Sequence, residues 1–240
     1  MPSQYRGETY FKETVYSEEE CMEENSGCKK EKTNTEFYTG KVGDIMCNLT
    51  SMAMNLNYLG VDKTYCNQQC SSCSTACNTQ TQLEDYLECV RKHINASGRT
   101  EYNTWKQIAN KFNLTYATAY VSTTRKFGDL NKTQFINDVN GYLSSGKSIQ
   151  MSVWPSCKGH IVRIVAISEK GIVVDDPYGN VDRTKSYANN TRTGFEQREN
   201  CSSGGYDTNN NSNSNKGKHN LWEWEEINGI TLKGIIIFGK

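Results

Sequence analysis

The sequence lacks an apolar run of about 18 residues, the length needed to cross a bilayer. It also lacks net charge, because 27 basic residues balance 27 acidic ones. No overall field therefore draws the chain towards nucleic acid or an anionic membrane. Residues 1–30 are polar throughout and have no apolar core of the kind found in a signal peptide. We expect no membrane span, no signal peptide and no nucleic-acid partner.

Histidine is scarce, with three residues, whereas cysteine is abundant, with ten. Cytosolic proteins keep their thiols reduced and rarely hold so many, while oxidising compartments favour disulfides. The cysteine content therefore predicts disulfides and an extracellular, envelope-associated or virion location. It also allows the chain to be a component of a larger assembly.

Four of the cysteines lie close together in a polar insertion that spans residues 61–80. A tetrathiolate zinc site is one interpretation of this cluster, and a loop stapled by disulfides is the other. Structural zinc sites usually pair two short cysteine motifs across a longer loop, which this cluster does not do. We favour disulfides and expect neither a metal nor a cofactor. The cysteines concerned are Cys66, Cys70, Cys73 and Cys77.

The chain length of 240 residues is enough for one large domain with a substantial core. Residues 1–35 carry many charges and no clear period, which predicts an N-terminal arm, pinned by disulfides or disordered. We assign residues 36–240 to the folded domain. Within it, residues 185–220 are rich in Asn, Ser and Gly, which is typical of a surface loop.

Apolar residues follow a helical period in the first half of the chain and an extended pattern in the second. This order predicts an α+β architecture, with a helical lobe packed on an antiparallel sheet. His93 lies beside the apolar face of one helix, and we expect it to be partly buried. The predicted helices are 47–59, 81–94, 103–113 and one ending near Gly146, and the predicted strands are 114–122, 148–154, 161–167, 171–174 and 230–238.

The helix predicted over residues 47–59 begins with Cys47, and Gly60 supplies the residue expected just past its end. Free backbone N–H groups and the helix dipole at such an N-terminus stabilise a negative charge. A thiolate, the reactive form of cysteine, is favoured there. Cys47 is therefore a candidate nucleophile if a histidine lies beside it.

His160 opens the strand that we predict at residues 161–167, and the next strand ends at Asp175 and Asp176. If the two strands are antiparallel neighbours, one of these aspartates lies near His160 and can orient its ring. The simpler alternative is that Asp176 belongs to a turn and accepts backbone N–H bonds. Cys157 and His160 are also a candidate pair of metal ligands, but the sequence shows no second pair to complete a site.

Three blocks of sequence together resemble the bacteriocin-processing peptidase family, which belongs to the papain-like cysteine peptidases. They are Cys-Asn-Leu-Thr-Ser-Met-Ala-Met from Cys47, Gly-His-Ile-Val around His160, and Val-Val-Asp-Asp-Pro-Tyr-Gly around Asp176. The variant with Cys-Asn and Thr-Ser is most similar to stand-alone members from bacteria and their phages. The resemblance covers roughly residues 44–180.

The resemblance implies a papain-like fold and a triad in which Cys47 is the nucleophile, His160 the general base and acid, and Asp176 the residue that orients His160. Asp175 is the alternative occupant of the third position. The implied reaction cleaves peptide bonds through a thioester intermediate. Family members that are joined to exporters cut leader peptides, whereas a stand-alone chain fits a peptidoglycan peptide or another protein as its substrate.

One feature departs from the family pattern, in which a glutamine a few residues before the nucleophile helps to form the oxyanion hole. No glutamine occurs between Asn34 and Met46. Asn34, Lys41 and Asn48 are the candidate replacements, with the Cys47 N–H as the other donor. The absence favours an alternative function, in which an inactive papain-like module binds a peptide or serves as a structural part of an assembly such as a virion.

Overall fold

The computed structural model describes residues 12–14, 35–37, 47–61, 83–96, 98–154, 159–177 and 218–240. The four clustered cysteines, Cys157 and nearly all of the predicted loop 185–220 lie outside these ranges. Strand β1 (Lys12–Thr14) of the predicted arm pairs antiparallel with β2 (Thr35–Phe37), which crosses the predicted boundary between arm and domain. Because the clustered cysteines lie outside the described ranges, the disulfide and zinc hypotheses stay predictions.

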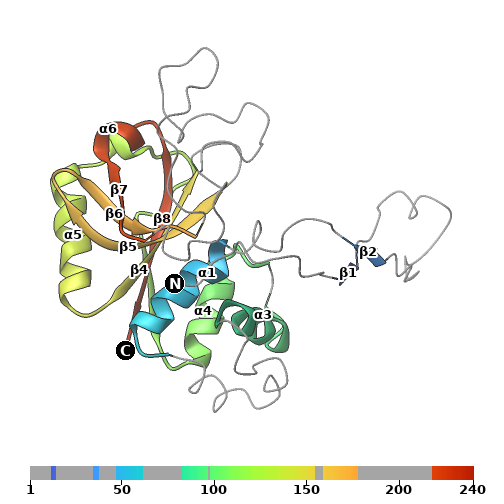
Figure 1. The fold of residues 1–240 in the computed structure, drawn as a ribbon. Coiled ribbons are helices and arrows are strands. Elements are labelled where there is room, and N and C mark those ends of the chain that lie inside the picture. Colours follow the sequence, from blue (N-terminus) through green and yellow to red (C-terminus); the bar gives the residue numbers. More distant parts are fainter. Residues whose placement is uncertain are drawn as a thin grey trace.

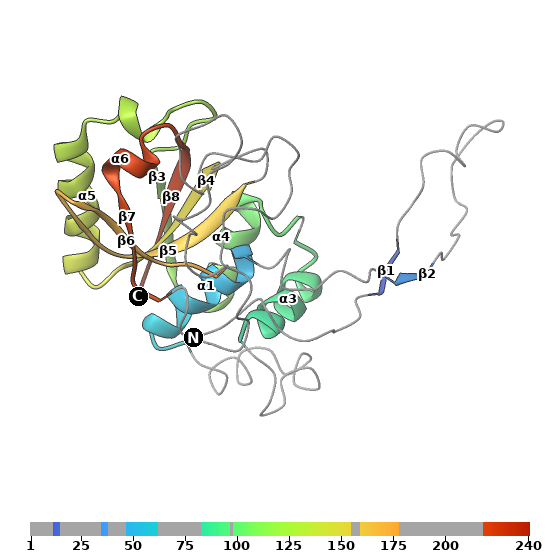
Figure 2. The same cartoon turned by 45° about the horizontal axis from the view of Figure 1, so that its top comes forward.

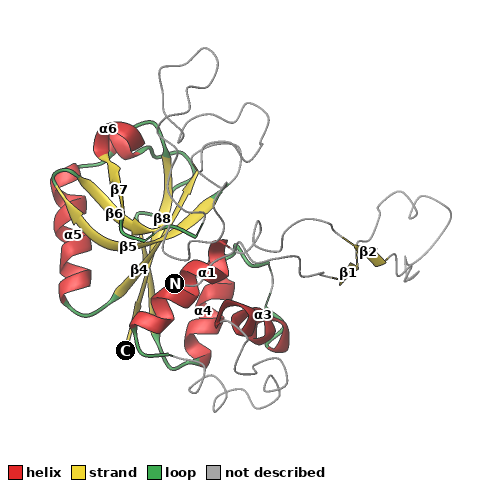
Figure 3. Ribbon diagram, viewed as in Figure 1, coloured by secondary structure: helices red, strands yellow, loops and turns green. Residues whose placement is uncertain are grey.

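A single antiparallel sheet lies at the centre of the described chain, and Figure 3 shows its strands in yellow. Strands β4, β5 and β6 follow one another along the chain and are neighbours in the sheet, whereas β8 is inserted between β3 and β4. Across the sheet the order is β3 (Thr115–Ala119), β8 (Thr231–Gly239), β4 (Ser148–Trp154), β5 (His160–Ser168), β6 (Gly171–Asp175) and β7 (Asn220–Glu223).

Helices cover this sheet from two sides, as Figures 1 and 2 show. Helices α1 (Cys47–Tyr58), α3 (Leu83–His93) and α4 (Tyr102–Lys111) form one lobe, and α5 (Lys132–Ser144) lies on the other side of the sheet. The short helices η4 (Phe127–Asp129) and α6 (Trp224–Ile227) pack with α5. None of the described helices is long and apolar enough to cross a membrane.

Two hydrophobic cores hold these layers together. The first joins α1, α3 and α4 to β5 and β8, where Ile161 and Phe238 face the helices. The second joins α5 and α6 to the other face of the sheet, where Val162 and Trp222 are buried. The predicted α+β fold, with a helical lobe packed on an antiparallel sheet, is confirmed.

Helix α1 is buried over ten consecutive residues, from Cys47 to Leu56. It ends as the sequence predicts, because Gly60 adopts a φ of +75°, a conformation that glycine takes without strain. The Gly60 N–H donates to Asn57 and the Val61 N–H donates to Leu56, the two bonds of a Schellman motif. The motif fixes where α1 ends, and so where its first residue lies against the sheet.

The structure corrects three details of the prediction. His93 is exposed, because α3 ends there and Ile94 takes the last position against the core. The predicted loop 185–220 ends too late, because Asn220 already belongs to β7. Strand β7 itself was not predicted, although its Trp222 is fully buried.

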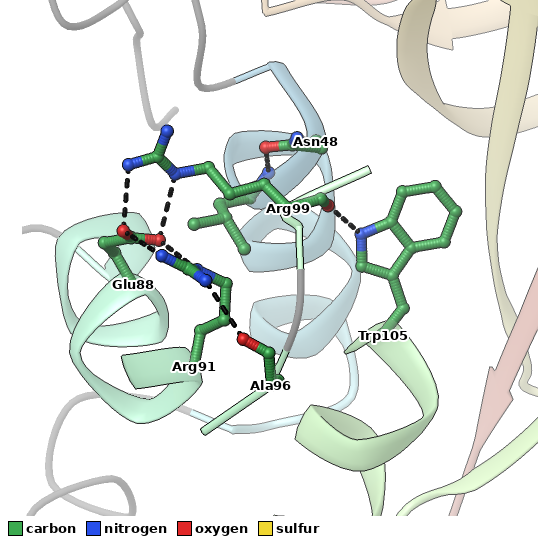
Figure 4. Close-up of polar contacts among 7 residues, drawn as sticks. Asn48, Glu88, Arg91, Ala96, Arg99 and Trp105 are labelled. Atoms are coloured by element: carbon green, nitrogen blue, oxygen red, sulfur yellow. Dashed lines mark hydrogen bonds and ion pairs between the residues drawn. The ribbon is translucent and has the colours of Figure 1, made fainter. Parts of the chain in front are cut away.

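A buried carboxylate links α3 to the turn that precedes α4 (Figure 4). Glu88 accepts two hydrogen bonds from Arg91 and two from Arg99, all between 2.8 and 3.0 Å. Arg91 also donates to the Ala96 carbonyl, and Trp105 donates to the Arg99 carbonyl. Burial raises the pKa of Glu88, but the hydrogen bonds and charges of the two arginines outweigh it and lower the pKa below its usual value.

Replacing Glu88 with Gln removes the charge that two largely buried guanidinium groups share, and we expect the free energy of unfolding at pH 7 to fall by about 3 kcal/mol. Because the pKa of Glu88 is lowered from 4.5, its contribution is complete above that pH and is lost as the pH falls through the folded-state value. Urea unfolding at pH 7 and in acid measures both effects. Glu225→Gln, at an exposed carboxylate, is the control and is expected to change stability by less than about 0.5 kcal/mol.

Candidate active site

Cys47 is the first residue of α1, and its side chain is buried. It forms no disulfide with any residue that the structure describes. The first N–H groups of a helix have no partner within the helix and favour negative charge beside them. The thiol thus lies where the sequence predicts it, with the positive end of a buried helix behind it.

His160 and Asp176 lie at the matching ends of two neighbouring strands. His160 is the first residue of β5, and Asp176 directly follows β6. The strands are antiparallel, so the end of β6 meets the beginning of β5. The His160 Nε2 atom and the Asp176 Oδ1 atom are 2.8 Å apart, and both side chains are almost fully buried. The turn therefore brings a carboxylate to the imidazole, as expected from the two strand ends.

Cys47, at the start of α1, is also a neighbour of the His160 imidazole and contributes to its pKa. The Nε2 atom of His160 contacts Asp176, and the Cys47 thiol lies close enough to the same ring to affect its pKa. Burial lowers the pKa of His160, but the charge and hydrogen bond of Asp176, together with the hydrogen bond and charge of Cys47, raise it to about 9. A positive charge on an imidazole ring favours the thiolate form of a neighbouring cysteine. The structure thus brings the three predicted residues together in one buried cluster.

Asp175, the other aspartate of the turn, has different partners. Its Oδ2 atom accepts a hydrogen bond from Arg163 at 3.1 Å, and its Oδ1 atom accepts the backbone N–H of His219 at 3.0 Å. The Arg163 guanidinium also stacks over the ring of Tyr58, at 4.7 Å from its centroid. Asp175 thus bonds Arg163 of β5 and the residue that precedes β7, and Asp176 is the aspartate that contacts His160.

A buried line of polar contacts fixes α1 against the sheet, and the sequence interpretation missed it. Ser51 donates to the carbonyl of Ile161, the residue after His160, at 2.7 Å. Asn55 donates to the Ser51 carbonyl and accepts from Ser148 of β4 at 2.6 Å. Ser51 and Asn55 lie four and eight residues after Cys47, a spacing that places all three on one helix face. That polar stripe was visible in the sequence, but its strand partners were not.

Of the three candidate oxyanion donors, Asn48 is the one that lies among the described residues. It is buried, and its Oδ1 atom accepts the N–H of Leu49 at 2.6 Å. Its amide N–H groups are the donors that remain for a substrate oxygen. Asn34 and Lys41 lie outside the described residues.

No group of three or more His, Cys, Asp or Glu side chains within the described ranges is arranged to hold a metal ion. The tetrathiolate zinc alternative and the half-site at Cys157 fall on residues that these ranges do not include.

A cysteine at the start of a buried helix, packed on an antiparallel sheet that carries a histidine–aspartate pair, defines the papain-like fold of cysteine peptidases. The chain belongs to the Peptidase_C39 like family, whose model matches residues 31–206. The matched range includes α1, the start of β5 and the turn after β6. The predicted family resemblance is thus confirmed. A search of curated proteins finds no match to the chain.

Proposed function

We propose that the protein is a cysteine peptidase in which Cys47, His160 and Asp176 form the catalytic triad. The observation that carries the proposal is the 2.8 Å contact between His160 Nε2 and Asp176, with the Cys47 thiol near the same ring. The three residues are buried, and neighbouring elements hold each of them. Membership of a peptidase family supports the same reaction class.

In the first half of the reaction, the Cys47 thiolate attacks the carbonyl carbon of the scissile peptide bond. The electron pair of the C=O bond moves to oxygen, and a tetrahedral intermediate forms. When this intermediate collapses, the His160 imidazolium gives its proton to the leaving amine. The carbonyl carbon then remains bound to Cys47 as a thioester.

In the second half, a water molecule enters beside His160, which is now neutral and accepts its proton. The resulting hydroxide attacks the thioester carbon, and the C–S bond breaks to release the carboxylic acid and the Cys47 thiolate. Asp176 keeps the ring in one orientation and stabilises its charged form in both halves. We assign the oxyanion contacts to the Cys47 N–H and the Asn48 amide.

The substrate class that we propose is a peptide of the cell wall or a segment of another protein. The alternative is an inactive module that binds a peptide or builds part of an assembly. The absence of a glutamine between Asn34 and Met46 favours this alternative, since loss of one oxyanion donor costs about 10²- to 10³-fold in rate.

Turnover and thiol reactivity distinguish these functions. We expect the full chain to cleave purified peptidoglycan peptides or members of a mixed peptide pool, and the Cys47→Ala variant to cleave none of them, as read by mass spectrometry. We also expect iodoacetamide at neutral pH to label Cys47 faster than an ordinary thiol peptide, because its thiolate is stabilised by charged His160.

Two results would contradict the proposal. Equal cleavage by the wild type and by Cys47→Ala would assign the activity to another group or to a contaminant. Labelling of Cys47 at the rate of an ordinary thiol, together with no cleavage of either substrate set, would favour the inactive module.

A further inference from the structure

An exposed tryptophan and a lysine lie together at the edge of the candidate active site. Trp154, the last residue of β4, is 42% exposed, and the ammonium of Lys233 lies 4.3 Å from the centroid of its ring. Val121, which is 56% exposed, lies against Gly234, the residue that follows Lys233. Trp154 and Val121 are two of the three large hydrophobic residues that are exposed in the described part of the chain.

This pair is adjacent to His160. Val153, the residue before Trp154, is the register partner of His160 in the sheet. The Cδ1 and Nε1 atoms of the Trp154 indole lie 3.9 Å from the point that a Cβ atom on Gly159 would occupy. Gly159 directly precedes His160, so a peptide held at the triad passes close to the indole.

Within the described part of the chain, the Lys233 ammonium lies over the Trp154 ring and forms no ion pair with a carboxylate. A second lysine provides the comparison. Lys132 also lies over a tryptophan, with its ammonium 5.5 Å from the Trp224 centroid, but it pairs with Glu169 at 3.1 Å. The lysine beside the candidate active site is thus the one whose charge is open to a carboxylate from outside.

We propose that Trp154 and Lys233 form a substrate subsite that binds a carboxylate of the peptide within a few residues of the scissile bond. The carboxylate pairs with the Lys233 ammonium, and the adjoining apolar atoms of the peptide lie on the indole and on Val121. The subsite rests on the proposed peptidase function and adds a substrate class to it, namely peptides that carry a carboxylate close to the scissile bond. The carboxylate comes from an acidic side chain or from a free peptide C-terminus.

Binding to the full-length Cys47→Ala variant tests the subsite without cleavage. Three fluorescent pools of N-acetyl hexapeptides serve as probes: one with a fixed central Gln and an amidated C-terminus, one with Glu in place of that Gln, and one with Gln and a free C-terminal carboxylate. We expect at least one carboxylate pool to bind about three- to fivefold more tightly than the neutral pool, as for a single exposed ion pair. The pool that shows the gain identifies the source of the carboxylate.

The preference is expected to disappear in Lys233→Met and to persist in the matched control Lys132→Met. Higher salt should reduce it, since an exposed ion pair is screened. Equal binding of all three pools, or a preference that survives Lys233→Met, overturns the subsite.

Incubating the same peptide pools with the wild type tests the subsite separately from the proposed peptidase function. Cleavage with no carboxylate preference overturns the subsite and leaves the peptidase function standing. A carboxylate preference in binding, with no cleavage by the wild type, overturns the peptidase function and leaves the carboxylate-binding site standing.

Discussion

His160→Gln is expected to lower kcat by about 10⁴-fold, because one group supplies both the proton for the leaving amine and the base for water. Gln is close to His in size, so the buried position stays filled, whereas Ala would leave a cavity. The same change should slow the labelling of Cys47 by iodoacetamide, since the thiolate loses its charged partner. Turnover of the cleaved peptide pool and the rate of labelling at pH 7 measure the two effects.

His93→Ala is the matched control, because the chain has three histidines and His93 is exposed at the end of α3. It should leave both rates unchanged. Fast labelling of Cys47 in His160→Gln would show that the helix N-terminus alone stabilises the thiolate. Unchanged turnover in that variant would remove His160 from the mechanism.

The local parts of the candidate site could be read from the sequence because they depend on local chemistry. The apolar period and Gly60 define α1, and they place Cys47 at its first turn. His160 and Asp176 lie at the ends of two consecutive strands, and antiparallel neighbours of that kind bring such ends together. The catalytic roles of these residues stay predictions, but their positions follow from short-range patterns.

What could not be read depends on contacts between distant segments. Ser51 meets the Ile161 carbonyl 110 positions later, and Ser148 meets Asn55 across 93 positions. A buried serine in an amphipathic helix gives no sign of which strand will satisfy it. Strand β7 was missed for a related reason: its four residues follow a long polar stretch, and its Trp222 becomes a core residue only when β6 lies beside it.

Asp176→Asn is expected to lower kcat by about 10²- to 10⁴-fold, because the amide keeps a polar contact with His160 but not the charge that stabilises the imidazolium. It should also change the pH profile. Burial lowers the pKa of His160 and the Asp176 carboxylate is the main group that raises it, so its loss lowers that pKa from about 9. The fall of kcat/KM on the alkaline side should therefore move to lower pH.

Asp175→Asn is the matched control, since Asp175 ends the same strand but pairs with Arg163. It should leave the alkaline limb in place, even if the loss of that ion pair lowers stability. An equal shift of the limb in both variants would mean that the general charge of the turn, and not the bond from Asp176, sets the pKa of His160.

Unfolding gives a readout of the same contact that does not depend on catalysis. The pKa of His160 is raised from 6.5 to about 9, so protonated His160 stabilises the fold fully below pH 6.5 and loses this contribution as the pH rises through about 9. Wild-type stability should therefore fall between pH 6.5 and 9, and Asp176→Asn should show a smaller fall. If the variant instead shows the full wild-type fall, His160 draws its charge stabilisation from elsewhere and Asp176 is not its partner in solution. A lost alkaline fall together with a shifted kcat/KM limb would tie the same carboxylate to both stability and turnover.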